Sequence, residues 1–268
     1  MIRRLLAPFA EELRRIWTQN GYLDGRRARK LKDVGRICAL AMQTMADALG
    51  AGDQPPNSDA IGRNILESNG AQSAPELLPS SGRHMHQRQR GSGPRHSRPR
   101  IIKAGDLVNI DVSAVKDGFF GDTGSSYAVP PVKKDIERLC RDGKRALWTG
   151  LQQVEAGEPL ADIGQLHRRF CQEEPLHADH QSRQSRHWPV AARSRKSLPP
   201  GRTRTKPRIM TDGLVFTVEP FLSTGAYWAE DGDDDPWTLF SDPSAPTVQF
   251  EHTVIATKNG PLILTLAE

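Results

Sequence analysis

The sequence predicts a mixed α/β fold (α+β), and two observations lead to this prediction. Some stretches repeat apolar residues at helical spacing, whereas others alternate apolar and polar residues with a period of two. The chain has 268 residues with 37% hydrophobic content, enough to bury one substantial core. No stretch approaches the roughly 18 consecutive apolar residues that span a bilayer, so we expect a soluble, cytoplasmic protein with no membrane partner.

Four stretches are predicted to be helices. Apolar residues recur three and four positions apart over residues 5–17 and 31–49, and the second stretch ends just before Gly50. The same spacing marks residues 133–155 and 160–171. Packing against a core explains all four apolar stripes.

The strand pattern appears in five places. Residues 107–115 and 119–129 alternate on either side of Asp117-Gly118, a pair of residues typical of hairpin turns. Further strands are predicted at 214–222, 248–257 and 261–266. A hairpin and three more strands therefore accompany the four helices.

Several carboxylates occupy the polar positions of these strands. Side chains alternate across a strand, so Asp111 shares a face with Asn109 and Ser113, opposite the apolar residues of the same strand. Glu219 and Glu251 stand in the same relation to their own strands. Asp122 lies on the partner strand of the Asp111 hairpin. For any one of these acids, a solvated sheet face is the simpler interpretation.

Four such carboxylates together indicate a metal site. Carboxylate oxygens with an imidazole are hard ligands suited to a pair of divalent ions. Two ions about 3.5 to 4 Å apart can activate a bridging water and polarise a carbonyl group. The pattern therefore predicts a metal-dependent hydrolase.

Three runs resemble a known family: KAGDLVNIDVSAVKDGFFGDTGSSYAV (103–129), TDGLVFTVEPFLSTGA (211–226) and QFEHTVIATKNGPLILT (249–265). They are similar to the type 1 methionine aminopeptidases. The resemblance implies one catalytic domain over residues 1–268 with the pita-bread fold, a curved antiparallel sheet covered by helices. It also implies removal of the N-terminal methionine from nascent chains, with nascent N-termini at the ribosome as partners and a monomeric enzyme.

The same resemblance implies roles for the four acids. Asp111 and Asp122 would bind one metal ion, and Asp122 and Glu251 would bridge a pair of ions. Glu219 would belong to the second ion's shell and help to activate the water, as the catalytic residue. The ions would be Co, Mn, Fe or Zn, among which the donor types do not discriminate.

Two basic segments depart from the family pattern. Residues 79–100 hold six arginines and no acid, and residues 175–208 hold seven arginines and two lysines against the single acid Asp179. Six of the eight histidines also lie there. The family has its three functional histidines in these places, within Cys-Ile-Ser-Val-Asn-Glu…His-Gly-Ile-Pro and His-Gly-Ile-Gly-Arg-Ser-Leu-His-Glu. Neither motif is present in this chain.

A shift of reading frame accounts for the missing motifs. Codons exist for residues 84–97 that, read one base later, give Thr-Cys-Ile-Ser-Val-Asn-Glu-Ala-Val-Ala-His-Gly-Ile. Residues 185–195 read in the same way give His-Gly-Ile-Gly-Arg-Ser-Leu-His-Glu-Ala. We therefore predict that segments 78–100 and 172–208 are translated out of frame, which impairs the chain as written. The alternative is a true basic insertion in which His187 or His96 replaces a lost histidine.

Two other functions stay open at this point. A proline-specific peptidase of the same fold shares the carboxylates, although Glu251 followed by His252-Thr253-Val254 favours a methionine aminopeptidase. A non-enzymatic protein whose basic segments bind RNA is the other alternative. Those segments lack interleaved aromatic residues apart from Trp188, so no specific nucleic-acid partner is expected.

Overall fold

The computed structural model describes residues 25–50, 52, 55–77, 101–173, 208–226, 228–231 and 239–267. The helix predicted at 5–17 lies outside these residues. So do His96, His187 and almost all of the two basic segments. Within the described part, no helix combines the length and the apolar character needed to cross a bilayer.

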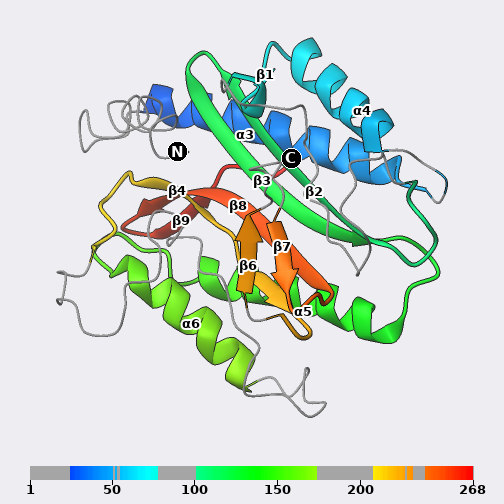
Figure 1. Cartoon of the computed structure of the whole chain (residues 1–268). Coiled ribbons are helices and arrows are strands. Elements are labelled where there is room, and N and C mark those ends of the chain that lie inside the picture. The colour runs from blue at the N-terminus through cyan, green and yellow to red at the C-terminus, as the bar shows by residue number, and fades with distance from the viewer. Residues whose placement is uncertain are drawn as a thin grey trace.

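The first helical pair packs on a long hairpin. Helix α3 (Gly25–Asp47) confirms the helix predicted at 31–49, although it begins earlier, and α4 (Pro55–Ser68) follows it. The sequence reasoning assigned no helix to 55–68, where two prolines occupy the first turn, a place that tolerates proline. Figure 1 shows α3 behind the hairpin and α4 beside it.

The hairpin consists of β2 (Leu107–Lys116) and β3 (Phe119–Ala128), close to the predicted bounds. Lys116 pairs with Phe119, so Asp117 and Gly118 form a two-residue loop. Their φ angles are 53° and 78°, both in the left-handed region that such hairpin loops require. Ile110 and Val112, fully buried, pack with the α3 residues Val34 and Ile37.

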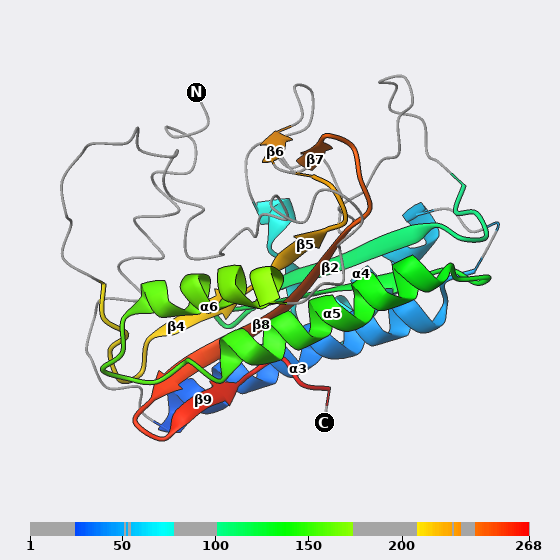
Figure 2. The same ribbon diagram turned by 90° about the horizontal axis from the view of Figure 1, so that it is seen from below.

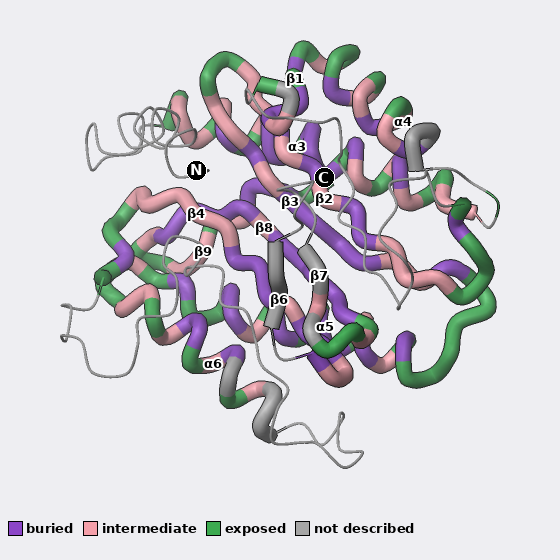
Figure 3. Tube along the Cα trace, in the orientation of Figure 1, coloured by how far each residue is buried: buried purple, intermediate pink, exposed green. Residues whose placement is uncertain are grey.

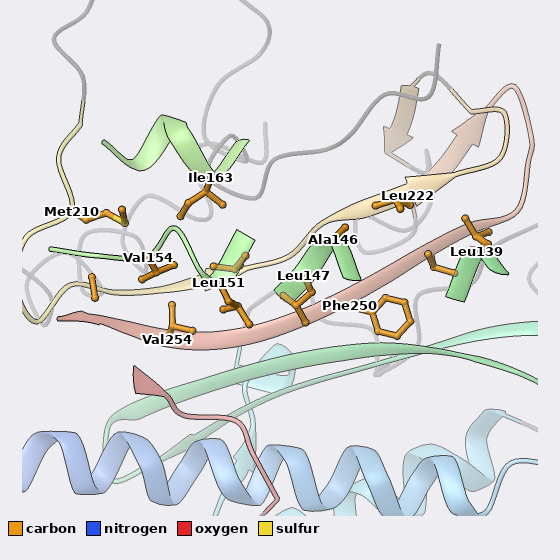
Figure 4. Close-up of a cluster of buried hydrophobic side chains, with 13 residues drawn as sticks. Leu139, Ala146, Leu147, Leu151, Val154, Ile163, Met210, Leu222, Phe250 and Val254 are labelled. Atoms are coloured by element: carbon orange, nitrogen blue, oxygen red, sulfur yellow. The ribbon is translucent and has the colours of Figure 1, made fainter. Parts of the chain in front are cut away.

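The second helical pair packs on strand β8 (Thr247–Thr257). Helices α5 (Lys134–Leu151) and α6 (Leu160–Glu173) match the predicted stretches, with α5 ending four residues early. Figure 4 shows their apolar side chains meeting Phe250 and Val254 of β8 in one buried cluster. The apolar phase of β8 therefore faces the helices.

The strand predicted at 214–222 is divided into two. It forms β4 (Val215–Val218) and β5 (Phe221–Ser223), which pair with different parts of β8. Pro220 has no N–H to donate to a ladder, so the strand is interrupted at Glu219 and Pro220. The interruption lies beside the predicted metal site.

The sheet is antiparallel throughout. Its path runs β1 (Gln72–Ser73), β2, β3, β8, β4, and β5 and β9 (Gly260–Ile263) also pair with β8. Strands β6 (Trp228–Asp231) and β7 (Leu239–Asp242) form a separate pair, and Pro75–Leu77 form a 3-10 turn. Figure 2 shows β8 running between the hairpin and α5. The alternation did not predict β1, β6 or β7.

Both helical pairs pack on the same face of the sheet. The buried β2 residues that pack with α3 are even-numbered, including Val112, and so are the buried β8 residues that pack with α5 and α6, including Phe250. Asp111 and Glu251 are odd-numbered and therefore point to the opposite face. That face is not solvated, because Asn109, Gln249 and Glu251 are each at most 3% exposed. Figure 3 shows the buried course of these strands.

Candidate metal centre

Three of the four predicted carboxylates meet on the face away from the helices. Asp111, Glu219 and Glu251 each offer one oxygen, and these three oxygens lie within 4.8 Å of one another. They come from β2, from the interruption after β4 and from β8. Side chains separated by up to 140 residues of sequence therefore form one cluster.

The strand register explains how two of these side chains meet. Asp111 and Glu251 are each paired with Gly124, which lies between them on β3. All three residues therefore point to one face of the sheet. Because Gly124 has no side chain, the space between the two carboxylates stays open to other groups.

Asp122, the fourth predicted acid, lies next to this cluster on β3. It is paired with Ser113, whose hydroxyl donates a hydrogen bond of 2.6 Å to the Asp122 Oδ1. Its backbone is tied to β8, because its N–H donates to Thr253 Oγ1 over 3.0 Å and its carbonyl accepts from the same hydroxyl over 2.6 Å. The register therefore places Asp122 on the carboxylate face.

Burial and mutual repulsion disfavour the charged forms of these acids. Burial raises the pKa of Asp122 well above its ordinary value, and the negative charges of Asp111 and Glu219 raise it further. Burial also raises the pKa of Glu251, with added effects from Asp122, Glu219 and Asp111, while a hydrogen bond from Thr217 lowers it. A cation placed among them would reverse these shifts.

The donor set fits a divalent metal ion. Four carboxylates supply oxygen ligands, which hard divalent cations prefer. Glu219 and Glu251 are buried and Asp111 and Asp122 are partly buried, so an unpaired negative charge is costly there and a cation relieves the cost. The simpler interpretation, acids on a solvated sheet face, is excluded for Glu219 and Glu251 because they are only 8% and 3% exposed.

The sequence reasoning missed an amide at the centre of the cluster. Gln249 Nε2 lies 2.6 Å from Glu219 Oε1, 3.1 Å from Glu251 Oε2 and 3.2 Å from Asp111 Oδ2. Its own Oε1 accepts a short hydrogen bond from Asn109 Nδ2. The alternation had placed Gln249 and Asn109 on this face, but it contained no sign of these contacts.

The two described histidines lie elsewhere. His252 points to the helical face, where its Nδ1 is 2.9 Å from Thr265 Oγ1 and its ring meets Trp148 edge-on at 6.1 Å. His167 of α6 is buried against Gly150 of α5. Burial lowers the pKa of each imidazole to about 4. Among the described residues, no histidine joins the carboxylates, and His96 and His187 lie outside this part of the chain.

A family profile, "Metallopeptidase family M24", matches residues 29–258. The chain belongs to this family. A methionine aminopeptidase of Staphylococcus epidermidis is 32% identical over 244 residues, which cover 88% of this chain and 94% of that protein. Methionine aminopeptidase 2 of Bacillus subtilis is 31% identical over 249 residues, covering 88% and 95%. The resemblance predicted from the three sequence runs is thus confirmed.

Solved structures of the family agree with the predicted fold. A methionine aminopeptidase of Rickettsia prowazekii superposes with a TM-score of 0.71 at 25% identity, covering 91% of this chain and 99% of that one. A prolidase of Pyrococcus horikoshii gives a TM-score of 0.64 at 16% identity, covering 91% and 63%. The pita-bread fold is therefore confirmed, and the prolidase likeness concerns the fold alone.

Proposed function

We propose that this protein removes the N-terminal methionine from peptides in a reaction that depends on divalent metal ions. The observation that carries the proposal is the buried meeting of Asp111, Glu219 and Glu251 with Asp122 alongside. The Staphylococcus and Bacillus relatives are both methionine aminopeptidases, which favours methionine as the residue released.

The carboxylates have distinct roles in this proposal. Asp111 and Asp122 would hold one ion, Asp122 and Glu251 would contribute to both ions, and Glu219 would complete the ligands of the second. The ions supply an activated water and a polarised peptide carbonyl. Glu219, a buried carboxylate beside the site, would assist by accepting a proton from that water.

The substrates are nascent peptide N-termini in the cytoplasm, and the enzyme acts as a monomer. A direct assay compares release of methionine from Met-Ala-Ser with cleavage of an Ala-Pro peptide, each with Mn²⁺ or Co²⁺. In a protein whose segments 78–100 and 172–208 are restored to the shifted frame, the proposal requires the first activity and its loss in Asp111→Asn. Preferential cleavage of Ala-Pro would instead assign a proline-specific peptidase.

The chain as written is proposed to be impaired. Its two predicted out-of-frame segments, 78–100 and 172–208, stand where the family has an imidazole ligand and two substrate-contacting histidines. Loss of one acid/base or positioning group typically costs about 10² to 10⁴-fold in rate. A cluster that keeps only carboxylates retains charge for binding metal but lacks these groups for handling protons.

A comparison of two proteins tests this impairment. One is the chain as written, and the other carries both segments in the shifted frame, with Asp111→Asn in that background as the inactive control. Release of methionine by the restored protein alone supports the frameshift. Equal rates would show that the basic segments are genuine and that His187 or His96 takes the histidine role. Sequencing the gene gives an independent answer, because compensating single-base changes are expected near codons 78, 100, 172 and 208.

A further inference from the structure

We propose that Gln249 is a positioning residue for the metal-binding carboxylates, and that Asn109 and Ser126 hold its amide in the required orientation. This inference rests on the proposed metal-dependent function and concerns how the site is prepared for a cation. Three residues form a chain of donors that runs from Ser126 through Asn109 to Gln249 and ends at the accepting carboxylates.

The first step fixes the orientation of Asn109. The Ser126 hydroxyl lies 2.9 Å from Asn109 Oδ1 and 3.1 Å from the Gln249 carbonyl oxygen, and it accepts from the Gln249 backbone N–H over 2.9 Å. When the hydroxyl donates to Asn109 Oδ1, that atom is the acceptor of the amide. The Nδ2 of Asn109 must then point toward Gln249.

The second step fixes the orientation of Gln249. Asn109 Nδ2 donates to Gln249 Oε1, so the NH₂ group of Gln249 faces the three carboxylates. The flipped amide would place Oε1 against three carboxylate oxygens and Nε2 against a donor. Both contacts would be repulsive, so the two amides and the hydroxyl specify one arrangement together.

The third step concerns space. Gly124 lies between Asp111 and Glu251 in the register, and a Cβ there would be 2.9 Å from Gln249 Nε2 and 3.0 Å from Oε1. The absence of a side chain at position 124 therefore creates the place that the amide fills. Gln249 is 1% exposed and Asn109 is 2% exposed, so water does not compete for these hydrogen bonds.

A neutral amide suits this task better than a cationic side chain. It brings carboxylates together without cancelling the negative charge that attracts a divalent ion. Each N–H bond occupies one of about four lone-pair positions of a carboxylate, so the remaining positions suit metal ligation. Groups that orient metal ligands in this way typically contribute 10 to 100-fold to metal affinity.

The experiment measures Mn²⁺ affinity of the full chain by titration calorimetry and the visible absorption of bound Co²⁺. Gln249→Met keeps the length of the side chain but removes both donors. Asn109→Leu keeps Gln249 and removes only the group that orients it. Gln72→Met, the same change at an exposed position of β1, is the matched control, and circular dichroism verifies folding.

We expect Gln249→Met and Asn109→Leu to weaken Mn²⁺ binding about 10 to 100-fold and to alter the Co²⁺ absorption, with Gln72→Met unchanged. A role limited to filling space would leave the Co²⁺ absorption as it is. Unchanged affinity in Gln249→Met would overturn the positioning role while leaving the proposed metal site intact. If Gln249→Met does not fold, the Mn²⁺ affinity of Asn109→Leu tests the positioning role in the same way. A parent chain that binds no divalent ion would overturn both the inference and the metal-dependent function.

Discussion

The side-chain amide of Gln249 packs directly against Gly124, with its Nε2 only 2.9 Å from the position that a Cβ of residue 124 would take. They belong to neighbouring antiparallel strands, β8 and β3, and the pairing of Gly124 with Glu251 brings them into contact. The carboxylate site thus depends on a residue that has no functional group.

This contact predicts the effect of adding one methyl group at position 124. In Gly124→Ala the new Cβ would be 2.9 Å from Gln249 Nε2, so the buried amide must move. We expect a loss of about 1 to 3 kcal/mol in the free energy of unfolding, as for other overpacked sites, together with weaker Mn²⁺ binding. Chemical denaturation and calorimetry measure the two effects.

The control for this change is Gly25→Ala at the start of α3. A Cβ there would be 3.8 Å from the nearest atom, on Arg29, and an exposed helical position favours alanine. Stability and Mn²⁺ affinity should therefore be kept or slightly improved. If the two variants behave alike, Gly124 does not create the place for Gln249.

The raised pKa values of the buried acids predict how stability of the metal-free protein depends on pH. Asp122 and Glu251 hold protons in the folded chain that the unfolded chain releases. Their contribution is fully present below the unfolded pKa near 4 and is lost as pH rises through the higher folded pKa. In EDTA, the contribution of these two acids to the free energy of unfolding should therefore fall with rising pH in this window.

Asp122→Asn supplies the comparison, because an amide resembles the protonated acid and does not titrate. Its pH dependence in EDTA should be shallower than that of the parent chain. Mn²⁺ should give the opposite trend in the parent, since the metal competes with protons and stabilises more strongly at higher pH. Equal slopes for Asp122→Asn and the parent chain in EDTA would contradict the buried, mutually repelling cluster.

The sequence predicted the faces of the strands but could not predict their neighbours. Alternation alone placed Asp111, Glu219 and Glu251 on the polar faces of their strands, and the structure brings oxygens of the three within 4.8 Å of one another, with Glu219 just beyond the end of β4. Alternation does not give the order of strands in a sheet. The prediction that β2, β8 and the end of β4 lie together therefore depended on the family resemblance. Alternation also cannot distinguish a solvated polar face from a buried one, which is why Gln249 and Asn109 passed unnoticed.

His167 predicts a second, opposite response to pH. Burial lowers the pKa of its imidazole to about 4, whereas the imidazole in the unfolded chain has a pKa near 6.5. Between these pH values the unfolded chain binds a proton that the folded chain does not. Its contribution is present above pH 6.5 and is lost as pH falls through about 4. This difference between the folded and unfolded pKa values corresponds to a change of at most about 3 kcal/mol in the free energy of unfolding.

His167→Phe keeps a ring in the same place and removes the titration. Its stability should decrease less than that of the parent chain between pH 6.5 and 4, although some acid sensitivity remains because the pKa of His252 is lowered in the same window. Denaturation at a series of pH values, with EDTA in both samples, gives the difference. Parallel curves for the two proteins would show that His167 is accessible to protons in the folded state.

The packing of His167 on Gly150 predicts that a usually stabilising change is harmful here. In an exposed helix, glycine to alanine gains about 1 kcal/mol. A Cβ at Gly150 of α5 would overlap the imidazole of His167 on α6, so Gly150→Ala should instead lose about 1 to 3 kcal/mol in the free energy of unfolding. The double variant Gly150→Ala/His167→Ala removes the overlapping ring. Because its alanine at 150 then has space, adding it to His167→Ala should cost little or even stabilise. An equal loss with and without the ring would place the strain elsewhere than between α5 and α6.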